Sequence, residues 1–389
     1  MQHDVIVVGG GLVGASFARA LRGRRIALVE SSRHATGAEA AAAEVFDARV
    51  YALSPGSVAF LEEIKAWQAI PAARRTPVRT MRVYGDDGAA RLDFDAYDTG
   101  VPELAWIVED RELQNAMWRA LGTQDDFEHY SGAVCAGLHI DAADARLELA
   151  DGRSISAHLV IGADGARSFV RSAAGIDACE RSYGQTAVVA NFSCSRAHAN
   201  VAFQWFQGGP VLALLPLPGD RTSMVWSVGD ARAAELMAAA PQQLARELEQ
   251  ASGGVLGTLE VITPPQAFAL RSVVAARTVA PRIALIGDAA HVIHPLAGQG
   301  ANLGFQDARA LAAVLAAAAP LRDPGELRLL RRYERSRREA VLAMRSTVDG
   351  LFELFGAQSV PLRRLRNFGL NLTGRLPVVR NVLARHALA

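Results

Sequence analysis

The chain of 389 residues is poor in cysteine, lysine and charge of one sign. Cys135, Cys179 and Cys194 show no CxxC spacing, so they predict neither a disulfide framework nor a thiolate zinc site, and they suit a reducing cytosol. Lysine occurs only at Lys65, and no Gly-Lys-Ser/Thr exists to form a P-loop. A formal net charge of +1 argues against a nucleic-acid surface reaching across the protein.

Long apolar runs are also missing: no run approaches the ~20 residues needed to cross a bilayer. The N-terminus lacks a cationic region ahead of its apolar run. We therefore expect a cytoplasmic protein, and we leave open a peripheral location at the inner face of the cytoplasmic membrane. Half of the residues are apolar, and the length predicts two or three domains.

A strand-to-helix turn opens the chain, because the strand-like VIVVG runs into GGGLVGASFARALRG, whose apolar residues recur at helical spacing. Gly9, Gly11 and Gly14 lie at this turn. In GxGxxG the first glycine permits the turn, the second lets backbone approach a pyrophosphate, and the third lets the helix pack on the strand. The next strand, RIALVE, ends on Glu30, which can accept hydrogen bonds from ribose hydroxyls. The pattern predicts a dinucleotide site and leaves NAD and FAD both open.

Two later segments repeat the strand-turn-helix plan. One is HLVIGADGARSFVRSAAGI, and the other is GDAAHVIHPLAGQGANLGFQDA, which follows the strand-like RIALI. The second contains His291 and His294, three residues apart. A zinc site of the HExxH kind needs histidines at i and i+4 with a glutamate base, so we expect no metal here.

Together these motifs resemble the three fingerprints of the class A FAD-dependent aromatic hydroxylases, and LAGQGANLG resembles the ubiquinone-biosynthesis hydroxylases of the 2-polyprenylphenol hydroxylase type. The segments RVYALSPGSVAFLEEIKAW, WIVEDRELQNAM, YERSRREAV and LRNFGLNL agree. The resemblance implies an α/β fold like that of p-hydroxybenzoate hydroxylase, in which a Rossmann-like FAD domain is interleaved with a β-sheet substrate domain. We expect the FAD domain at 1–75, 100–180 and 270–330, the substrate domain at 76–99 and 181–269, and a helical region at 331–389.

The resemblance also implies which residues bind FAD. Asp288 is expected to hydrogen-bond a ribityl hydroxyl, Arg49 to reach the phosphate and ribityl region, and Asp164 to serve both FAD and nicotinamide binding. A turn before a helix is expected beneath the isoalloxazine ring, where free N–H groups stabilise anionic reduced flavin. The full expected set is Gly9, Gly11, Leu12, Val13, Gly14, Glu30, Arg49, Arg111, Asp164, Gly287, Asp288, Pro295, Gly298, Gln299, Gly300, Ala301 and Asn302.

For catalysis, the resemblance places Pro295 near the face where oxygen and substrate meet. His294, next to it, is the candidate titratable group beside the phenol, with a packed or hydrogen-bonded role as the alternative. Short apolar runs between about Gly184 and Ala269 predict an antiparallel sheet. On it, Phe206, Leu214 and Trp226 are candidates for an apolar substrate pocket, and ordinary sheet core is the alternative for each.

Residues 361–389 carry six arginines and one histidine without an acid, interleaved with apolar residues. Such a stretch is typical either of docking on an anionic membrane surface or of a helix that packs on the protein body with its arginines in water. Both alternatives stay open, as do a homo-oligomer and a biosynthetic complex.

The resemblance implies an FAD-dependent monooxygenase that hydroxylates the ring of a polyprenylated phenol or benzoquinol in ubiquinone biosynthesis. NADH or NADPH would reduce the flavin transiently, and O2 would react through a C4a-hydroperoxyflavin. Two alternatives are a hydroxylase of a small soluble aromatic acid and a catalytically idle FAD-binding scaffold subunit. The ring carbon and the preferred nicotinamide are left open.

Overall fold

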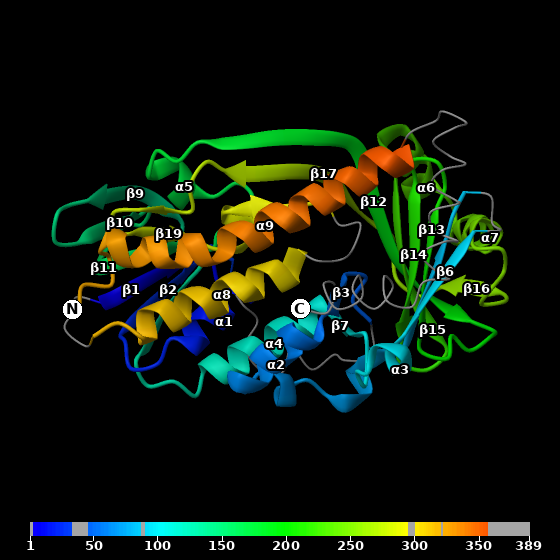
Figure 1. Cartoon of the computed structure of the whole chain (residues 1–389), viewed down its shortest axis with the longest axis horizontal. Helices are drawn as coiled ribbons and strands as arrows, with labels where there is room; N and C mark the ends of the chain where they lie inside the picture. The colour runs from blue at the N-terminus through cyan, green and yellow to red at the C-terminus, as the bar shows by residue number, and fades with distance from the viewer. Residues whose placement is uncertain (1–2, 33–45, 87–89, 295–299, 320–321, 357–389) are drawn as a thin grey trace.

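The computed structural model describes residues 3–32, 46–86, 90–294, 300–319 and 322–356. An eight-stranded sheet lies at the left of Figure 1 and contains the N-terminal strand. Its strands are β1 (His3–Val8), β2 (Ile26–Glu30), β8 (Phe127–Ser131), β9 (Cys135–Ile140), β10 (Ala145–Leu149), β11 (Ser154–Gly162), β18 (Val279–Ala280) and β19 (Ile283–Leu285). They are arranged in the order β18-β19-β11-β1-β2-β8, and β10 and β9 extend from β11.

The centre of this sheet is parallel: β1 pairs with β2 and β11, β2 with β8, and β11 with β19. A parallel strand is covered on both faces, which explains why VIVV in β1 and IALV in β2 are apolar without alternation. Each predicted strand of the three motifs lies in this sheet. The expectation of an α/β, Rossmann-like unit assembled from distant segments is confirmed.

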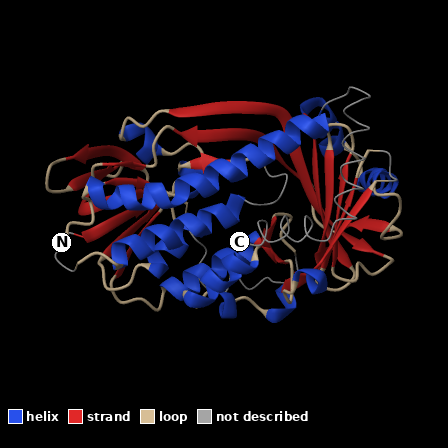
Figure 2. Cartoon of the chain, in the orientation of Figure 1, coloured by secondary structure: helices blue, strands red, loops and turns tan. Residues whose placement is uncertain are grey.

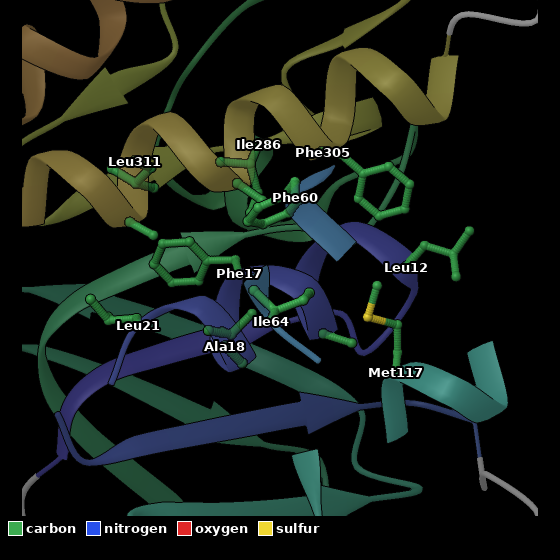
Figure 3. Packing of buried hydrophobic residues seen from close by; sticks show 14 of the residues in the cluster. Leu12, Phe17, Ala18, Leu21, Phe60, Ile64, Met117, Ile286, Phe305 and Leu311 are labelled. Atoms are coloured by element: carbon green, nitrogen blue, oxygen red, sulfur yellow. The ribbon is translucent and has the colours of Figure 1, made fainter. Parts of the chain in front are cut away.

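The helices that cover one face of the sheet include α1 (Leu12–Ala20), α2 (Pro55–Glu63), α4 (Asp110–Leu121) and α8 (Gly300–Ala316). Figure 3 shows their packing, in which Phe17 of α1 and Leu311 of α8 belong to one buried cluster with Met117 of α4. Fully burying a side chain of this kind contributes about 1.5–3 kcal/mol. The opposite face carries Ile6 and Val160 and is covered by β9, β10 and α5 (Phe169–Ala173).

A second, nine-stranded sheet stands at the right of Figure 1 and Figure 2. Its strands are β5 (Thr80–Tyr84), β6 (Arg91–Asp95), β12 (Ala178–Cys194), β13 (Val201–Phe206), β14 (Val211–Leu217), β15 (Arg221–Gly229), β16 (Leu259–Val261), β17 (Gln266–Ala275) and β20 (His291–Val292). The order is β20-β17-β12-β15-β14-β13-β5-β6, with β16 beside β12.

This sheet is antiparallel as expected except for one pair, since β13 and β5 run parallel. About 120 residues separate these two strands in the sequence, so no hairpin turn sets their direction. The outer face of the sheet packs under α6 (Asp230–Ala238) and α7 (Pro241–Ala251). Its inner face points toward the segment that contains Asp47 and leads to Arg49, because Asn191 on β12 donates a hydrogen bond to the carbonyl oxygen of Asp47 (2.7 Å).

A three-stranded sheet, β3-β7-β4, lies between the other two. Its strands are β3 (Val50–Leu53), β4 (Arg75–Val78) and β7 (Ala105–Glu109). The short helices are α3 (Ala96–Thr99), η2 (Trp67–Ala69), η3 (Ala72–Arg74) and η4 (Gly287–Ala289).

The helix α9 (Leu327–Gly356) connects the two large sheets, as Figure 1 shows. Near its start Tyr333 packs in the core of the first sheet, and near its end Val348 packs against the second. The expected C-terminal helical region therefore begins as α9, and 357–389 lies outside the described residues. No helix within the described ranges is long and apolar enough to cross a bilayer. The domain boundaries stay a prediction, because β12 and β17 run without a break between the two large sheets (Figure 1).

Candidate active site

The first motif forms the turn between β1 and α1. Gly9 has φ of 103°, and a Cβ there would lie 2.3 Å from the carbonyl oxygen of Ala163. A Cβ on Gly14 would lie 2.0 Å from the oxygen of Gly9, so α1 packs directly on the turn. At Gly11 no atom lies within 4 Å of such a Cβ. The N-terminus of α1 is thus open where a pyrophosphate has to approach, and the turn fits a dinucleotide.

Leu12 and Val13 follow this turn and pack against protein. Leu12 belongs to the main core, and Val13 contacts the third motif: a Cβ on Gly304 would lie 2.4 Å from its Cγ2. A Cβ on Gly287 would lie 3.2 Å from the same valine. The start of α1 is therefore in direct contact with both the Gly287 turn and α8.

Glu30 ends β2 beside the glycine turn. The backbone N–H of Gly10 donates to its Oε2 (2.6 Å), and the N–H and hydroxyl of Ser32 donate to Oε1 (2.9 and 2.7 Å). Burial alone would raise the pKa of Glu30, but these hydrogen bonds outweigh burial and lower the pKa. A carboxylate is thereby fixed at the position where a ribose is expected.

Asp288 lies in η4, directly after β19. Solvent reaches its side chain, yet the surrounding protein is dense enough for burial to raise its pKa. Nearby positive charge from His291, Arg49 and Arg271 acts in the opposite direction. From these two properties we infer that Asp288 lines a recess open to solvent, and such carboxyl groups cluster at functional sites.

Arg49, just before β3, lines the same recess. Its guanidinium lies 5.2 Å from the centroid of the Tyr51 ring and 5.5 Å from that of Phe268. Burial would lower the pKa of Arg49, but Tyr51, Asp110 and Asp288 outweigh burial and raise it. The structure thus brings Arg49 and Asp288 together from positions 239 residues apart in the sequence.

Arg111 stands next to Asp110 in the first turn of α4. Its backbone N–H donates to Oδ2 of Asp47 (3.2 Å), which fixes the segment that leads to Arg49. Asp110, rather than Arg111, is the residue whose charge acts on Arg49 and on Tyr51. Sequence reasoning missed Asp110 and Tyr51, although both lie within two residues of positions that it chose.

Asp164 holds the second motif in place. Its carboxylate accepts hydrogen bonds from the hydroxyl of Ser168 (2.5 Å) and the N–H of Val170 (3.1 Å). Burial raises the pKa of Asp164, although these hydrogen bonds lower it in part. The buried Arg171 then donates to the carbonyl oxygen of Ala289 (3.0 Å), which ties the second motif to the third.

Asn302 fixes the start of α8 from within the protein. Its Oδ1 accepts from the N–H of Ser54 (2.9 Å) and the hydroxyl of Ser57 (2.7 Å), and its Nδ2 donates to the oxygen of Ala52 (2.9 Å). Gly300 and Ala301 form the first turn of α8. The predicted residues Pro295, Gly298 and Gln299 lie outside the described residues.

A buried charge network, missed from the sequence, supports the Gly287 turn. Asp307 on α8 is fully buried; its Oδ2 lies 2.7 Å from Nε2 of His291 and accepts from the N–H of Gly287 (3.1 Å). Its Oδ1 accepts from Nε of Arg337 on α9 (2.8 Å). Burial lowers the pKa of His291, but Asp307 outweighs burial and raises it.

His294 has different surroundings from His291. Only 1% of its surface is exposed, and its ring lies 4.6 Å from the ring of Tyr183 and 5.1 Å from that of Phe352. Burial lowers the pKa of His294 to about 4. No cluster of three or more potential metal ligands occurs in the described part of the chain.

The three predicted pocket residues lie on different faces of the nine-stranded sheet. Phe206 packs with Ile293 and Leu303, on the inner face. Leu214 and Trp226 instead pack in the core beneath α6 and α7, so the structure does not bring them to this site. Because side chains alternate along a strand, their neighbours point inward. The inner-face positions include Ala187, Val189, Ala213, Leu215 and Val225, together with the polar residues Asn191, Ser223 and Ser227.

The glycine turns and the fixed carboxylate of Glu30 define a dinucleotide-binding protein, and comparisons with known proteins identify the dinucleotide as FAD. The model of the FAD binding domain family matches residues 2–347. The fold resembles PqsL, a probable FAD-dependent monooxygenase from Pseudomonas aeruginosa, with a TM-score of 0.79 and 25% identity over 95% of this chain and 99% of that one. It also resembles p-nitrophenol 4-monooxygenase PnpA from Pseudomonas putida, with a TM-score of 0.79 and 19% identity over 100% and 98% of the two chains, which shows the fold alone.

Curated relatives show to which family of FAD-binding proteins the chain belongs. The chain is 34% identical to ubiquinone hydroxylase UbiL of Rhodospirillum rubrum, over 99% of this chain and 89% of that protein. It is 35% identical to 3-demethoxyubiquinol 3-hydroxylase of Escherichia coli, over 99% and 98%. It is 32% identical to the mitochondrial ubiquinone biosynthesis monooxygenase COQ6 of Drosophila melanogaster, over 100% and 90%. The chain belongs to the family of FAD-dependent ubiquinone-biosynthesis hydroxylases. It is an FAD-dependent monooxygenase, and NAD(P)H is the co-substrate typical of such enzymes.

Proposed function

We propose that this protein hydroxylates the aromatic ring of a polyprenylated phenol or benzoquinol on the route to ubiquinone, using NAD(P)H and O2. One observation carries the proposal: three cofactor motifs converge on the recess at Arg49 and Asp288, beside an inner sheet face of small, uncharged side chains. The names of the relatives from Rhodospirillum, Escherichia and Drosophila support the same substrate class.

In this proposal the N-terminus of α1, opened by Gly11, binds the pyrophosphate of FAD, and Glu30 binds a ribose. Arg49 and Asp288 hold the phosphate and ribityl region. Asp164 fixes the turn of the second motif, so that Arg171 in this motif stays in contact with the third. The bound FAD supplies the redox chemistry, since it accepts hydride from NAD(P)H and activates O2.

The start of α8 is proposed to lie beneath the flavin ring. Its free N–H groups and positive helix end favour negative charge on that ring. Gly300, Ala301 and Asn302 form this end, and Pro295, Gly298 and Gln299 are assigned to the same turn from the sequence alone. The protein's own task is to keep water out and to orient the substrate ring.

The substrate ring is proposed to lie against the inner face of the nine-stranded sheet. Ala187, Val189, Ala213 and Val225 present small apolar side chains there, and Phe206 closes one side. A hydroxylase of a small aromatic acid would need a cation opposite the substrate carboxylate. The four apolar positions carry none, and Arg49, over the Phe268 ring, is assigned to the phosphate and ribityl region, which favours a lipophilic phenol.

The test is the absorbance spectrum of the purified protein, followed by anaerobic titration with NADH and NADPH, with and without 2-prenylphenol. We expect bound FAD that is reduced faster when the phenol is present. Bound FAD that NAD(P)H never reduces would favour the scaffold alternative. A folded protein that takes up no added FAD would contradict the central claim.

We further propose that 361–389 docks the enzyme on an anionic membrane, where a polyprenyl chain partitions. Six arginines without an acid in this segment support docking. The test is sedimentation of the full chain with phosphatidylglycerol or phosphatidylcholine vesicles. Binding only to the anionic vesicles, weakened by salt, is expected; equal binding to both vesicle types, or none, would contradict it.

A further inference from the structure

His294 is a buried polar side chain without a hydrogen bond. Only 1% of its surface is exposed, and neither ring nitrogen has a partner in the described part of the chain. Native proteins rarely leave such a group unpaired, because an unmade buried hydrogen bond costs about 1–3 kcal/mol. Two other buried histidines are satisfied: Nε2 of His291 lies 2.7 Å from Asp307, and Nε2 of His198 lies 2.8 Å from the oxygen of Leu217. The imidazole of His294 is therefore available to a group other than the side chains and backbone of the described residues.

Aromatic rings from two distant elements surround this imidazole. Tyr183 of β12 meets it edge to face at 4.6 Å, and Phe352 of α9 lies at 5.1 Å. Such apolar surroundings keep the ring neutral near pH 7, since burial lowers the pKa of His294 to about 4. A neutral imidazole has one nitrogen free to accept a hydrogen bond.

One carboxylate lies close enough to act on His294. Asp349 on α9 raises its pKa slightly against the effect of burial, and Asp349 accepts a hydrogen bond from the hydroxyl of Tyr183 (2.8 Å). Asp349 is itself 3.5 Å from Nε of Arg345, and its side chain is 26% exposed. Arg181 on β12, whose guanidinium lies 5.7 Å from the Tyr183 ring, is 3.8 Å from Glu353 of α9. A positive charge on His294 would thus be stabilised by Asp349, at the edge of the solvent.

His294 also lies at the right place for a substrate. The residue before it, Ile293, packs with Phe206 and Val211 on the inner face of the nine-stranded sheet. Asp288, which lines the cofactor recess, is six residues earlier on the same short segment. The Phe352 ring, which lies beside the imidazole, packs against the same cluster, so His294 borders the inner sheet face.

We propose that His294 accepts the hydrogen bond of the substrate's phenolic hydroxyl and takes its proton during hydroxylation; this rests on the proposed function. One atom of O2 adds to a ring carbon as the O–O bond breaks, while the other atom leaves as water and NAD(P)H supplies the two electrons. During this addition electrons move from the hydroxyl oxygen into the ring, and the O–H group becomes strongly acidic. The O–H bond breaks, its electron pair completes a carbonyl, and the proton forms an N–H bond on His294. Even a weak base suffices at that stage. Transfer of the ring proton to oxygen then restores the aromatic product.

The test compares 2-prenylphenol with its methyl ether, which keeps the ring and the prenyl chain but has no O–H to donate. Wild-type enzyme is expected to bind the phenol about 3–10-fold more tightly than the ether, as one hydrogen bond predicts. His294→Phe removes the acceptor, so phenol and ether should bind equally. NADH oxidation should continue in this variant, while hydroxylated product per NADH falls about 100-fold or more and H2O2 forms instead.

His294→Gln separates binding from proton transfer. An amide oxygen accepts a hydrogen bond but does not take the proton, so this variant should keep the preference for the phenol and still lose product. A matched control is His198→Gln, at another buried histidine. Per bound FAD, the control should keep both the phenol preference and the coupling of NADH to product.

Three outcomes would overturn the inference. One is a wild-type enzyme that reacts with the phenol but binds phenol and ether equally. Another is a His294→Phe enzyme that retains the phenol preference, and the third is a His294→Gln enzyme that forms product at the wild-type ratio. If the phenol fails to stimulate NADH oxidation in the wild type, the proposed function itself fails, which is a distinguishable result.

Discussion

Replacing Asp307 by asparagine tests the buried charge network that supports the Gly287 turn. The carboxylate contacts His291, Arg337 and the N–H of Gly287. Because Asp307 is fully buried, these partners replace all of its contacts with water. Asparagine keeps the shape but removes the charge, leaving the guanidinium of Arg337, whose side chain is 12% exposed, without its counterion. Removing one partner of such a buried pair costs about 3–5 kcal/mol. The free energy of unfolding should fall by that amount.

The loss should also depend on pH. The folded-state pKa of His291 is raised, because Asp307 outweighs burial, so its contribution to stability is complete below the unfolded value of about 6.5 and is lost as pH rises through the folded value. The pKa of Asp307 is lowered despite burial, because His291 and Arg337 favour the carboxylate, so its contribution is present above about pH 4 and is lost only in acid. In Asp307→Asn, burial and Arg337 both lower the pKa of His291, so acid now opposes folding. The difference between wild type and variant should be larger at pH 6 than at pH 8.5.

Equilibrium urea unfolding at pH 6 and pH 8.5, with excess FAD and followed by circular dichroism, measures both effects. A matched control is Asp151→Asn, which breaks the exposed pair between Asp151 and Arg153 (2.6 Å) and should leave the urea midpoint unchanged at both pH values. The network has no such role if Asp307→Asn unfolds like wild type. A loss of equal size at the two pH values would refute the assigned charge of His291.

Two further pairs of variants separate binding from folding. Gly11→Ala points a methyl group into open space, so the apoprotein should melt at the wild-type temperature. Its affinity for FAD, measured by fluorescence titration, should fall at least 10-fold. In Gly14→Ala the methyl group would lie 2.0 Å from the oxygen of Gly9, so this variant should destabilise the apoprotein itself. Equal behaviour of the two variants would refute the distinct roles of these glycines. Val225→Phe fills the inner sheet face and should raise KM for 2-prenylphenol at unchanged stability, whereas Leu214→Ala should lower stability by about 2–5 kcal/mol at unchanged KM. The reverse pattern would show that the substrate binds the other face.

Sequence patterns predicted those parts of the fold that are formed by residues close together in the chain. The turn at Gly9 follows from a strand, a glycine spacing and a helix that are contiguous in sequence, and so does the position of Glu30. Composition could not show which face of a strand is turned inward. Ala213 and Leu214 are neighbours in the sequence, and only the register of β14 with β13 and β15 determines which of the two side chains faces inward.

Long-range contacts account for the other misses. Asp307 lies within the GDAAHVIHPLAGQGANLGFQDA motif, yet its role depends on Arg337, 30 residues later and on another helix. The parallel pairing of β13 with β5 likewise joins segments that no hairpin connects. One signal in the sequence could have suggested the network. Asp307 lies on the apolar face of a predicted helix, and Arg337 follows in the YERSRREAV segment.

The unbroken strands β12 and β17 restrict how this enzyme opens. They pair from Ala178 with Ala275 to Val189 with Gln266, through one irregularity between Ser182 and Gln185, and so join the cofactor side of the molecule to the sheet. Rigid-body hinging of the two halves would have to break this ladder, and hinges normally lie in loops or at the ends of elements. Access for a long lipophilic substrate must therefore come from local movement of side chains and loops around a fixed frame. Crosslinking β12 to β17 should leave turnover intact.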